Sequence, residues 1–362
     1  MVNTGEEHEI VDPGEQNRLG EKYRDGVGVE KDLEEAAKWF RKAAEQELPE
    51  AQNNLGVAYR DGLGVKQDLK EASDWFLEAS DAHRFNEAQN NLAVMYREGL
   101  GYEKSLTEAV RWYTEAAEMG HAKAQKNLGE MYRDGLGIKQ DFSEAAKWYR
   151  KAAKQGNEEA QASFDKILES EEPDFRNMSK SVLNKLMDAV TGDPKAQTDL
   201  GNAYYNGDDI GKDCAKAFKW YKRSAEQGFD IGQNNLGELY NDGEGVERSY
   251  SEAIKWYERA AEQGNCDAQN NLGKLYMYGE GVEPDSGKAM EWFLKAEKQG
   301  SSLAQFNLGE MYQYGYGVEE NEVEAIKWYK KSAEQGLDKA QNELGKMYQY
   351  GYGVEENSVE AA

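Results

Sequence analysis

The chain of 362 residues has few cysteines and histidines and an excess of acidic side chains. Its two cysteines, Cys214 and Cys266, are too few for the disulfide framework of a small secreted domain. The three histidines, His8, His83 and His121, are scattered, and neither cysteine has a metal-ligand neighbour in the sequence. We therefore expect no metal, no cofactor and no enzymatic activity.

Basic residues are outnumbered, because 44 Lys and Arg against 69 Asp and Glu give a formal net charge of −25. Nucleic-acid backbones and anionic membrane surfaces both favour basic patches. The sequence also has no apolar run of about 18 residues, the length of a membrane span, and no basic and apolar leader at its start. We expect a cytoplasmic protein whose partner is neither a nucleic acid nor a membrane.

Glycine and aromatic residues are abundant and recur in a fixed register. A Leu-Gly pair returns every 36 residues, with one extra residue near His83 and one missing pair at Phe164. A tryptophan lies twenty residues after eight of the nine leucines, and the chain has eight tryptophans in all. This spacing indicates a repeat array. The leucines are Leu19, Leu55, Leu92 (followed by alanine), Leu128, Leu200, Leu236, Leu272, Leu308 and Leu344; the tryptophans are Trp39, Trp75, Trp112, Trp148, Trp220, Trp256, Trp292 and Trp328.

Each repeat carries the apolar pattern of two helices. In the repeat that starts at Ala51, apolar residues spaced four, three and one apart form one helical stripe, which Gly62 and Gly64 end in a turn. Asp68 then stands at an N-cap position. Because this Gly-x-Gly follows a helix rather than a strand, it predicts a turn and not a phosphate site. The second stripe consists of Ala72, Trp75, Phe76 and Ala79.

These features predict an all-α fold: an α-solenoid of about nine to ten 36-residue helix-turn-helix repeats that form a superhelix with a concave face. A hairpin of this kind can bury its apolar face only against its neighbours. The glycine of each Leu-Gly pair allows a partner helix to approach closely, and the tryptophan is large enough to fill the groove between hairpins.

The register also predicts the organisation of the chain. We expect an N-terminal tail at 1–14, an N-terminal array at 15–162, a degenerate in-frame repeat at 163–195 and a C-terminal array at 196–362. The degenerate repeat lacks the Leu-Gly pair, the loop glycines and the tryptophan. We favour a drifted repeat that still packs, and the alternative is a joint between the two arrays. The last hairpin is incomplete, because the sequence ends before its tryptophan position.

The repeat unit resembles the Sel-1-like repeat family. The resemblance rests on Ala-x-x-x-Leu-Gly-x-x-Tyr, on Gly-x-Gly-Val and on Glu-Ala-x-x-Trp-Tyr-x-x-Ala-Ala-Glu-Gln-Gly, and it covers nearly the whole chain from about Glu15. That family is similar to tetratricopeptide repeats but has a longer hairpin loop. The resemblance implies a scaffold or adaptor that assembles proteins. The cysteine pair found in every repeat of some secreted bacterial members is missing from this chain.

By the same resemblance, the first helices line the concave face and their polar positions contact the partner. An asparagine two residues before the leucine and an arginine five residues after it could bind an acidic or phosphorylated segment. Exposed tyrosines six residues after the leucine could hold an aromatic anchor. An alternative remains for the arginines, because each is followed by an acid with which it can pair locally. The candidates are Asn53, Asn90, Asn234 and Asn270; Arg60, Arg97 and Arg133; and Tyr278, Tyr314 and Tyr350.

We expect a non-enzymatic scaffold or adaptor that binds a peptide or a folded protein on its concave face. The alternative is an acidic inhibitor or immunity-type protein whose charge blocks the basic site of an enzyme. Strong weakening by salt and sensitivity to mutation of outer acidic residues would favour the inhibitor.

Overall fold

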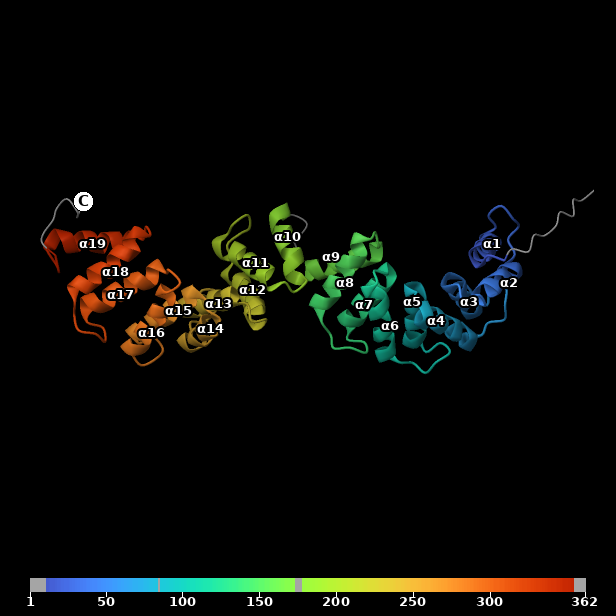
Figure 1. Cartoon of the computed structure of the whole chain (residues 1–362), viewed down its shortest axis with the longest axis horizontal. Helices are drawn as coiled ribbons and strands as arrows, with labels where there is room; N and C mark the ends of the chain where they lie inside the picture. Colours follow the sequence, from blue (N-terminus) through green and yellow to red (C-terminus); the bar gives the residue numbers. More distant parts are fainter. Residues whose placement is uncertain (1–10, 84, 173–177, 355–362) are drawn as a thin grey trace, which may run out of the picture. The chain divides into compact units, whose positions relative to one another are not determined.

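The computed structural model describes residues 11–83, 85–172 and 178–354, which contain α-helices and no strand (Figure 1). His8 and the end of the predicted last hairpin, residues 355–362, lie outside the described residues. The helices are α1 (Pro13–Asp25), α2 (Leu33–Ala44), α3 (Pro49–Asp61), α4 (Leu69–His83), α5 (Asn86–Glu98), α6 (Leu106–Glu118), α7 (Ala122–Asp134), α8 (Phe142–Lys154), α9 (Glu158–Glu171), α10 (Lys180–Val190), α11 (Pro194–Asn206), α12 (Cys214–Glu226), α13 (Asp230–Asp242), α14 (Tyr250–Glu262), α15 (Cys266–Tyr278), α16 (Ser286–Glu297), α17 (Ser302–Tyr314), α18 (Glu322–Glu334) and α19 (Asp338–Tyr350).

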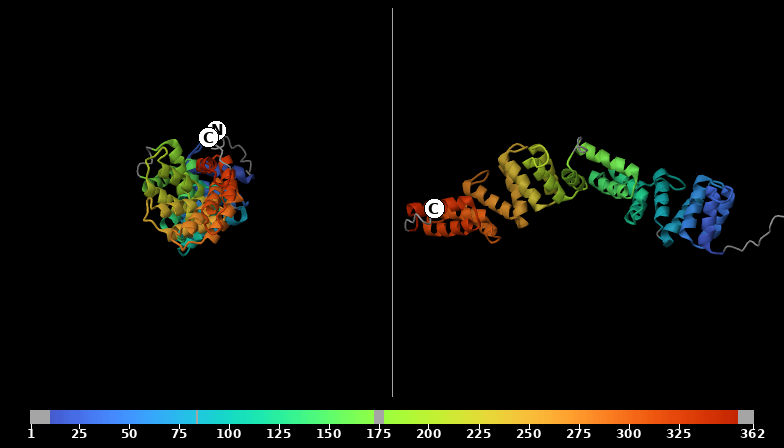
Figure 2. Two further views of the ribbon diagram at one scale, coloured as in Figure 1. Left: turned by 90° about the vertical axis from the view of Figure 1, so that its left-hand side faces the viewer. Right: turned by 90° about the horizontal axis from the view of Figure 1, so that it is seen from above.

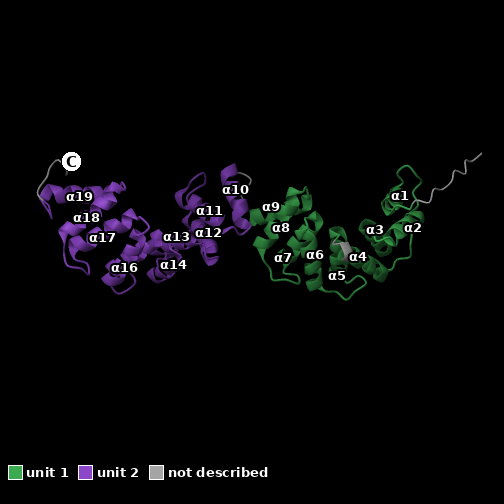
Figure 3. Ribbon diagram, viewed as in Figure 1, with its two compact units in different colours: residues 1–174 green, residues 175–362 purple. Residues whose placement is uncertain are grey.

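The chain forms two compact units, residues 1–174 and residues 175–362 (Figure 3). Unit 1 contains α1 to α9 and unit 2 contains α10 to α19. Within each unit every helix packs against its neighbours in sequence, so the helices stack as successive pairs (Figure 2). This arrangement confirms the predicted α-solenoid. We call α1, α3, α5, α7, α9, α11, α13, α15, α17 and α19 the first helices, and the others the second helices.

Short polar signals set the helix ends. The Asp141 side chain accepts hydrogen bonds from the backbone N–H groups of Ser143 and Glu144, which begins the second helix α8. The first helix α3 ends at Gly62, whose φ of 70° is left-handed and whose N–H bonds to the Ala58 carbonyl. A Cβ on the next loop glycine, Gly64, would collide with the backbone of the preceding repeat. The Gly-x-Gly is therefore a structural turn, as predicted.

In seven repeats the glycine of the Leu-Gly pair lies beneath an aromatic ring of its own hairpin. A Cβ added to Gly237 would lie 2.7 Å from ring carbon Cδ1 of Tyr257, which is buried. In the third repeat the equivalent residue is Ala93, and both it and Tyr113 are fully buried. The other pairs of this kind are Gly20 with Phe40, Gly56 with Phe76, Gly129 with Tyr149, Gly201 with Tyr221, Gly273 with Phe293 and Gly309 with Tyr329.

The tryptophans pack between repeats, while the aromatic residue after each one fills its own hairpin. Trp75 of α4 packs against a core cluster that joins two repeats, with Ala44 from α2 of the preceding repeat and Leu55 from α3 of its own. Trp292 of α16 and Trp328 of α18 likewise pack against clusters that join the preceding second helix to the first helix of their own repeat. At these positions the predicted role of the tryptophan is confirmed.

The irregular repeat contributes one helix to each unit. In α9, Phe164 takes the place of the usual leucine and is buried. In α10 the apolar side chains Val182, Leu186 and Val190 are buried. Helix α9 packs on α8 in unit 1, and α10 packs on α11 in unit 2. The unit boundary lies within the segment predicted as degenerate, and the exact domain limits stay a prediction.

Among the described residues, no helix combines the length and the apolar character that crossing a bilayer requires.

We predict that Gly237→Ala destabilises unit 2. The new methyl group would meet the Tyr257 ring at 2.7 Å, and overpacking of this kind costs about 1–3 kcal/mol. Urea unfolding followed by circular dichroism measures the loss. The control is Gly211→Ala, because a Cβ at Gly211 meets nothing within 4 Å. If Gly237→Ala were as stable as the parent, the close approach of Gly237 to Tyr257 would not contribute to stability.

Candidate functional site

The predicted asparagines form an asparagine ladder that links successive first helices. In unit 1, Asn53 Oδ1 accepts a hydrogen bond from Asn91 Nδ2 of the next repeat at 2.9 Å. In unit 2, Asn270 Oδ1 accepts one from Asn307 Nδ2 at 2.7 Å. The donor lies one residue before the repeat leucine and the acceptor lies two before it. The same bond joins Asn54 to Asn17 at 3.0 Å, Asn127 to Asn90 at 3.1 Å and Asn271 to Asn234 at 3.2 Å.

The ladder gives the four predicted asparagines a structural role. Asn53, Asn90, Asn234 and Asn270 are only 4–6% exposed, and each Oδ1 is engaged by the next repeat. Buried amides require such partners, because an unsatisfied one costs about 1–3 kcal/mol. Contact between these four residues and a partner stays a prediction. The donor asparagines were not predicted, although the recurring Asn-Asn-Leu triplet is their signal.

The three predicted arginines each pair with the acid that follows them. Arg60 Nε lies 2.7 Å from Asp61 Oδ1, and its hydrogen bond lowers the pKa of that carboxyl. Arg97 pairs with Glu98 at 2.8 Å and also reaches Glu130 at 3.6 Å. The local pairing that the sequence suggested is therefore present.

These arginine pairs are nevertheless accessible to solvent. Arg133 Nη2 lies 2.7 Å from Asp134 Oδ2. The side chains of Arg60, Arg97 and Arg133 are 22%, 28% and 39% exposed. Partly exposed pairs of this kind contribute about 0–1 kcal/mol, so an incoming carboxylate or phosphate could replace the local acid.

A groove of about 640 Å³ opens between the first helices α5, α7 and α9 of unit 1. Lys126 lies in it between Glu130 and Glu159, at 2.9 Å and 3.1 Å. Burial opposes its charge, but the hydrogen bonds to these two acids outweigh burial and raise the pKa of Lys126. Of the predicted residues the groove contains Asn90. It is lined by Asn90, Asn91, Val94, Lys123, Lys126, Asn127, Asn157, Glu158 and Glu159.

The lysines of this groove were not predicted. Lys126 occupies the position two residues before Leu128, where the repeats at Leu55 and Leu92 have asparagine. This lysine in place of asparagine is the sequence signal by which the groove could have been found. The groove therefore contains two lysines that the repeat pattern did not predict, alongside the acids Glu158 and Glu159.

Five exposed tyrosines form a tyrosine surface on unit 2: Tyr278, Tyr314, Tyr316, Tyr350 and Tyr352. The three predicted tyrosines, which end α15, α17 and α19, are 47%, 52% and 61% exposed in chain order. Tyr316 in the following loop lies 6.3 Å from the Tyr278 ring and 6.0 Å from the Tyr314 ring, measured between centroids. Tyr350 and Tyr352 are 5.9 Å apart.

Acidic residues of the next repeat border the tyrosine surface. The Tyr278 hydroxyl donates a hydrogen bond to Glu310 Oε2 at 3.4 Å. Burial and the Glu310 charge together raise the pKa of Tyr278 to about 12. Burial also raises the pKa of Glu310. At neutral pH the Tyr278 phenol therefore stays a protonated hydrogen-bond donor.

The metal-ligand types of this chain do not gather in one place in the part that the structure describes. Within it, no group of three or more His, Cys, Asp or Glu residues is arranged to hold a metal ion. Cys214 and Cys266 are free thiols. What the geometry offers is hydrogen-bonding, charged and aromatic surface.

The Sel1 repeat model matches nine segments of the sequence, and the chain belongs to this family. Residues 158–193, which hold α9 and α10, lie outside the matched segments. No curated protein matches the chain. The matched segments are 16–48, 49–83, 86–121, 122–157, 194–229, 231–265, 266–301, 302–337 and 338–362.

Solved structures of several bacterial proteins are similar to the chain. One is c5321 of uropathogenic Escherichia coli, a protective antigen with an SLR fold, which is 38% identical over 96% of this chain and 74% of that one, with a TM-score of 0.48. A Sel1 repeat protein from Oxalobacter formigenes is 28% identical over 93% and 87%, with a TM-score of 0.38. The immunity protein PA5088 from Pseudomonas aeruginosa is 18% identical over 69% and 82%, with a TM-score of 0.32.

We predict that Asn270→Ala destabilises the chain by about 1–3 kcal/mol, because it leaves the ladder amide of Asn307 without its acceptor. Asn342→Ala is the matched control, since Asn342 has the same repeat position but is exposed. We expect the control to change stability by less than about 0.5 kcal/mol. Urea unfolding compares the two variants, and equal losses would contradict a structural role for the ladder.

We predict that Glu310→Gln lowers the pKa of Tyr278 from about 12 toward its ordinary value. Removing the neighbouring negative charge makes the phenolate less costly, while the burial remains. A pH titration of ring-¹³C-labelled tyrosine by NMR follows each hydroxyl separately. Glu343→Gln is the control, because Glu343 raises the pKa of Tyr314. An unchanged Tyr278 pKa in Glu310→Gln would contradict the assigned cause.

Proposed function

We propose that the chain is a non-enzymatic scaffold or adaptor that binds a protein partner through its first helices and the loops that follow them. Sel1 repeat proteins generally mediate protein–protein interactions, and this chain belongs to that family. The tyrosine surface is the observation that carries the proposal. Its side chains are exposed rather than part of the core, and they recur on three consecutive repeats of unit 2.

The tyrosine surface suits an apolar or aromatic anchor of the partner. Tyrosine is enriched at binding hot spots because it offers a large, rigid contact area and one hydrogen-bonding group. Tyr278, Tyr314 and Tyr350 would supply this contact area from equivalent positions of α15, α17 and α19. Contacts among the five rings hold some of them in place before binding, which reduces the entropy lost on association.

Unit 1 offers a different chemistry, suited to an acidic or phosphorylated segment. Arg60, Arg97 and Arg133 recur along its first helices and can exchange a local acid for one on the partner. The groove beside Asn90 adds Lys123 and Lys126. A charge-assisted hydrogen bond of this kind contributes about 1.5–3 kcal/mol. In this proposal the asparagine ladder, including Asn53, Asn234 and Asn270, borders the contact and fixes the spacing of the repeats.

A second candidate function is an acidic inhibitor or immunity-type protein that covers the basic site of an enzyme. The net charge of −25 favours it, because such charge attracts a basic partner over a long range. In that case the binding residues would be acids on the outer surface rather than the arginines and tyrosines of the first helices.

Capture from a lysate of the source cells, with mass spectrometry, tests the proposal. We predict that Tyr278→Ala/Tyr314→Ala/Tyr350→Ala lowers recovery of a specific partner about tenfold or more, because hot-spot truncations cost about 2 kcal/mol or more. The control Phe142→Ala/Val323→Ala removes two exposed apolar side chains outside this surface and should retain the partner.

The arginine variant Arg60→Glu/Arg97→Glu/Arg133→Glu separates the surfaces. Loss of a partner from this variant alone would assign that partner to unit 1. A different result would overturn the scaffold in favour of the inhibitor. Both variants would retain the same partner, salt would release it, and the protein would inhibit the partner's enzymatic activity.

A further inference from the structure

Seven of the eight tryptophans carry a cation of their own helix over the indole ring. In six of them it comes from the residue three positions after the tryptophan, as with Lys42 over Trp39 at 4.2 Å from the centroid. Cation–π contacts of this kind are favourable because the ring face is negative. The others are Arg111 over Trp112 at 4.2 Å, Lys151 over Trp148 at 3.9 Å, Arg223 over Trp220 at 4.7 Å, Arg259 over Trp256 at 4.7 Å, Lys295 over Trp292 at 3.7 Å and Lys331 over Trp328 at 4.2 Å.

Trp75 is the exception. In the sequence, acids occupy both positions from which the other repeats supply the cation, Asp74 before the tryptophan and Glu78 three residues after it. Within the described part of the chain, no lysine or arginine lies over its ring. Cations of the preceding repeat are engaged elsewhere, with Arg41 over Tyr59 and Lys42 over Trp39.

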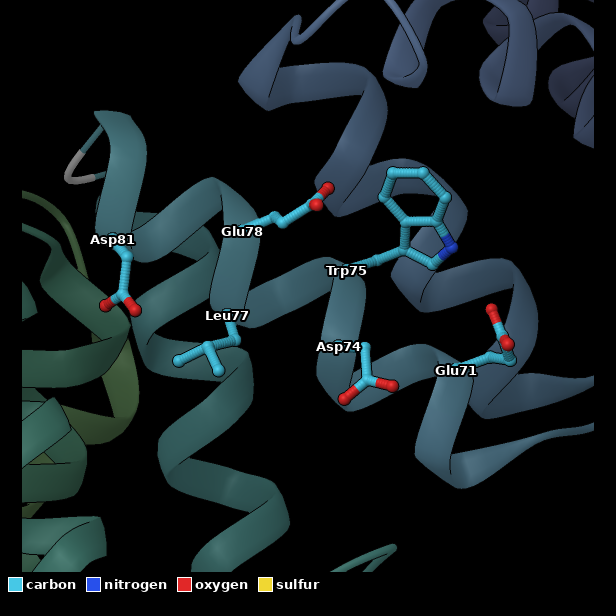
Figure 4. Close-up of a pocket in the computed structure, with 6 residues that line it drawn as sticks. All are labelled: Glu71, Asp74, Trp75, Leu77, Glu78 and Asp81. Carbon is cyan, nitrogen blue, oxygen red and sulfur yellow. The ribbon is translucent and has the colours of Figure 1, made fainter.

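An open pocket of about 470 Å³ lies at Trp75, on the second helix α4 (Figure 4). Besides Trp75 and Leu77 it is lined by four carboxylates. Glu78 accepts a hydrogen bond from Gln52 Nε2 at 3.4 Å, and it is the one of the four with a side-chain hydrogen bond in the described structure. The carboxylates are Glu71, Asp74, Glu78 and Asp81, which project from α4 along with the indole.

The Trp75 ring is held in position before any ligand arrives. It is half-buried and packs against the core cluster of α2 and α3. The ring therefore loses little freedom when a cation binds to its open part, which favours binding. Aromatic surface with surrounding carboxylates attracts a cation in two ways, through the ring quadrupole and through charge.

We propose that this Trp75 pocket binds a lysine or arginine side chain from a basic segment of a protein partner. At the other seven tryptophans a lysine or arginine of the same helix already lies over the indole ring. At Trp75 the chain presents two acids instead, so the cation has to come from outside. The pocket belongs to a second helix of unit 1 and is distinct from the tyrosine surface, so either site can exist without the other.

Indole N–H signals in a ¹H–¹⁵N NMR spectrum of the full chain test this inference. Trp75→Phe, which removes one signal, assigns it. The probe is the peptide acetyl-Gly-Lys-Gly-Arg-Gly-Lys-Gly-amide, and its matched neutral probe carries norleucine and citrulline at the charged positions. We expect the basic peptide to shift the Trp75 signal saturably while the other seven stay unmoved, because their rings already carry cations.

The variant Asp74→Lys/Glu78→Lys gives Trp75 the flanking residues of Trp39. We expect it to weaken peptide binding at Trp75 about tenfold or more, since it fills the ring face with an internal cation and removes two acids. Glu30→Lys/Glu103→Lys is the control, because it makes the same change in net charge at exposed loop residues of unit 1. We expect the control to reduce affinity less than threefold, and circular dichroism verifies that both variants are folded.

Three results would overturn the inference. If the two lysine variants lost the same peptide affinity, binding would be explained by general charge attraction. If the neutral peptide bound as tightly as the basic one, the pocket would be an apolar site. A Trp75 signal that moves with protein concentration alone, together with self-association in light scattering, would assign the pocket to a second copy of this chain.

Discussion

The structure depends on the close approach of the two helices of a hairpin, which in seven repeats places a glycine beneath an aromatic ring. A Cβ at Gly237 or at the six equivalent glycines would meet the ring, so this position stays small, and the third repeat has only alanine there. Once that distance is set, the tryptophan of the second helix reaches the preceding repeat and the first helices come close enough for asparagine to pair with asparagine. This contact therefore also sets the spacing between equivalent surface residues of successive repeats.

Positions along the first helix differ in how much of the side chain remains available to a partner. The asparagines before the repeat leucine are buried in the ladder, the arginines five residues after it are half-exposed in local pairs, and the tyrosines one residue further are open. Binding chemistry can therefore change at the end of the helix without disturbing the ladder. Unit 1 has arginine and acid there, whereas the last three repeats of unit 2 have tyrosine. The same scaffold thus presents two chemically different surfaces.

The solenoid was predictable because its signals are local: a Leu-Gly pair, two loop glycines and a tryptophan in one register. The exposure of Tyr278, Tyr314 and Tyr350 at the helix end followed from the same register. The pairing of Asn53 with Asn91 did not, because it depends on how far one first helix is offset from the next, which no single repeat encodes. The Trp75 pocket was missed for a related reason. Its two flanking acids become informative only when the structure shows that other repeats place a cation there.

The amide ladder also bears on how such an array can change its length. In a repeat with two adjacent asparagines, such as Asn53 and Asn54, one amide donates to the repeat before it and the other accepts from the repeat after it. A gene duplication that inserts one more repeat with both asparagines beside a repeat of the same kind would give each new amide a complementary neighbour, and deletion of such a repeat would leave its neighbours complementary. Unequal recombination could thus lengthen or shorten the protein without creating an unsatisfied buried group, and the surface positions of the new repeat would be free to diverge.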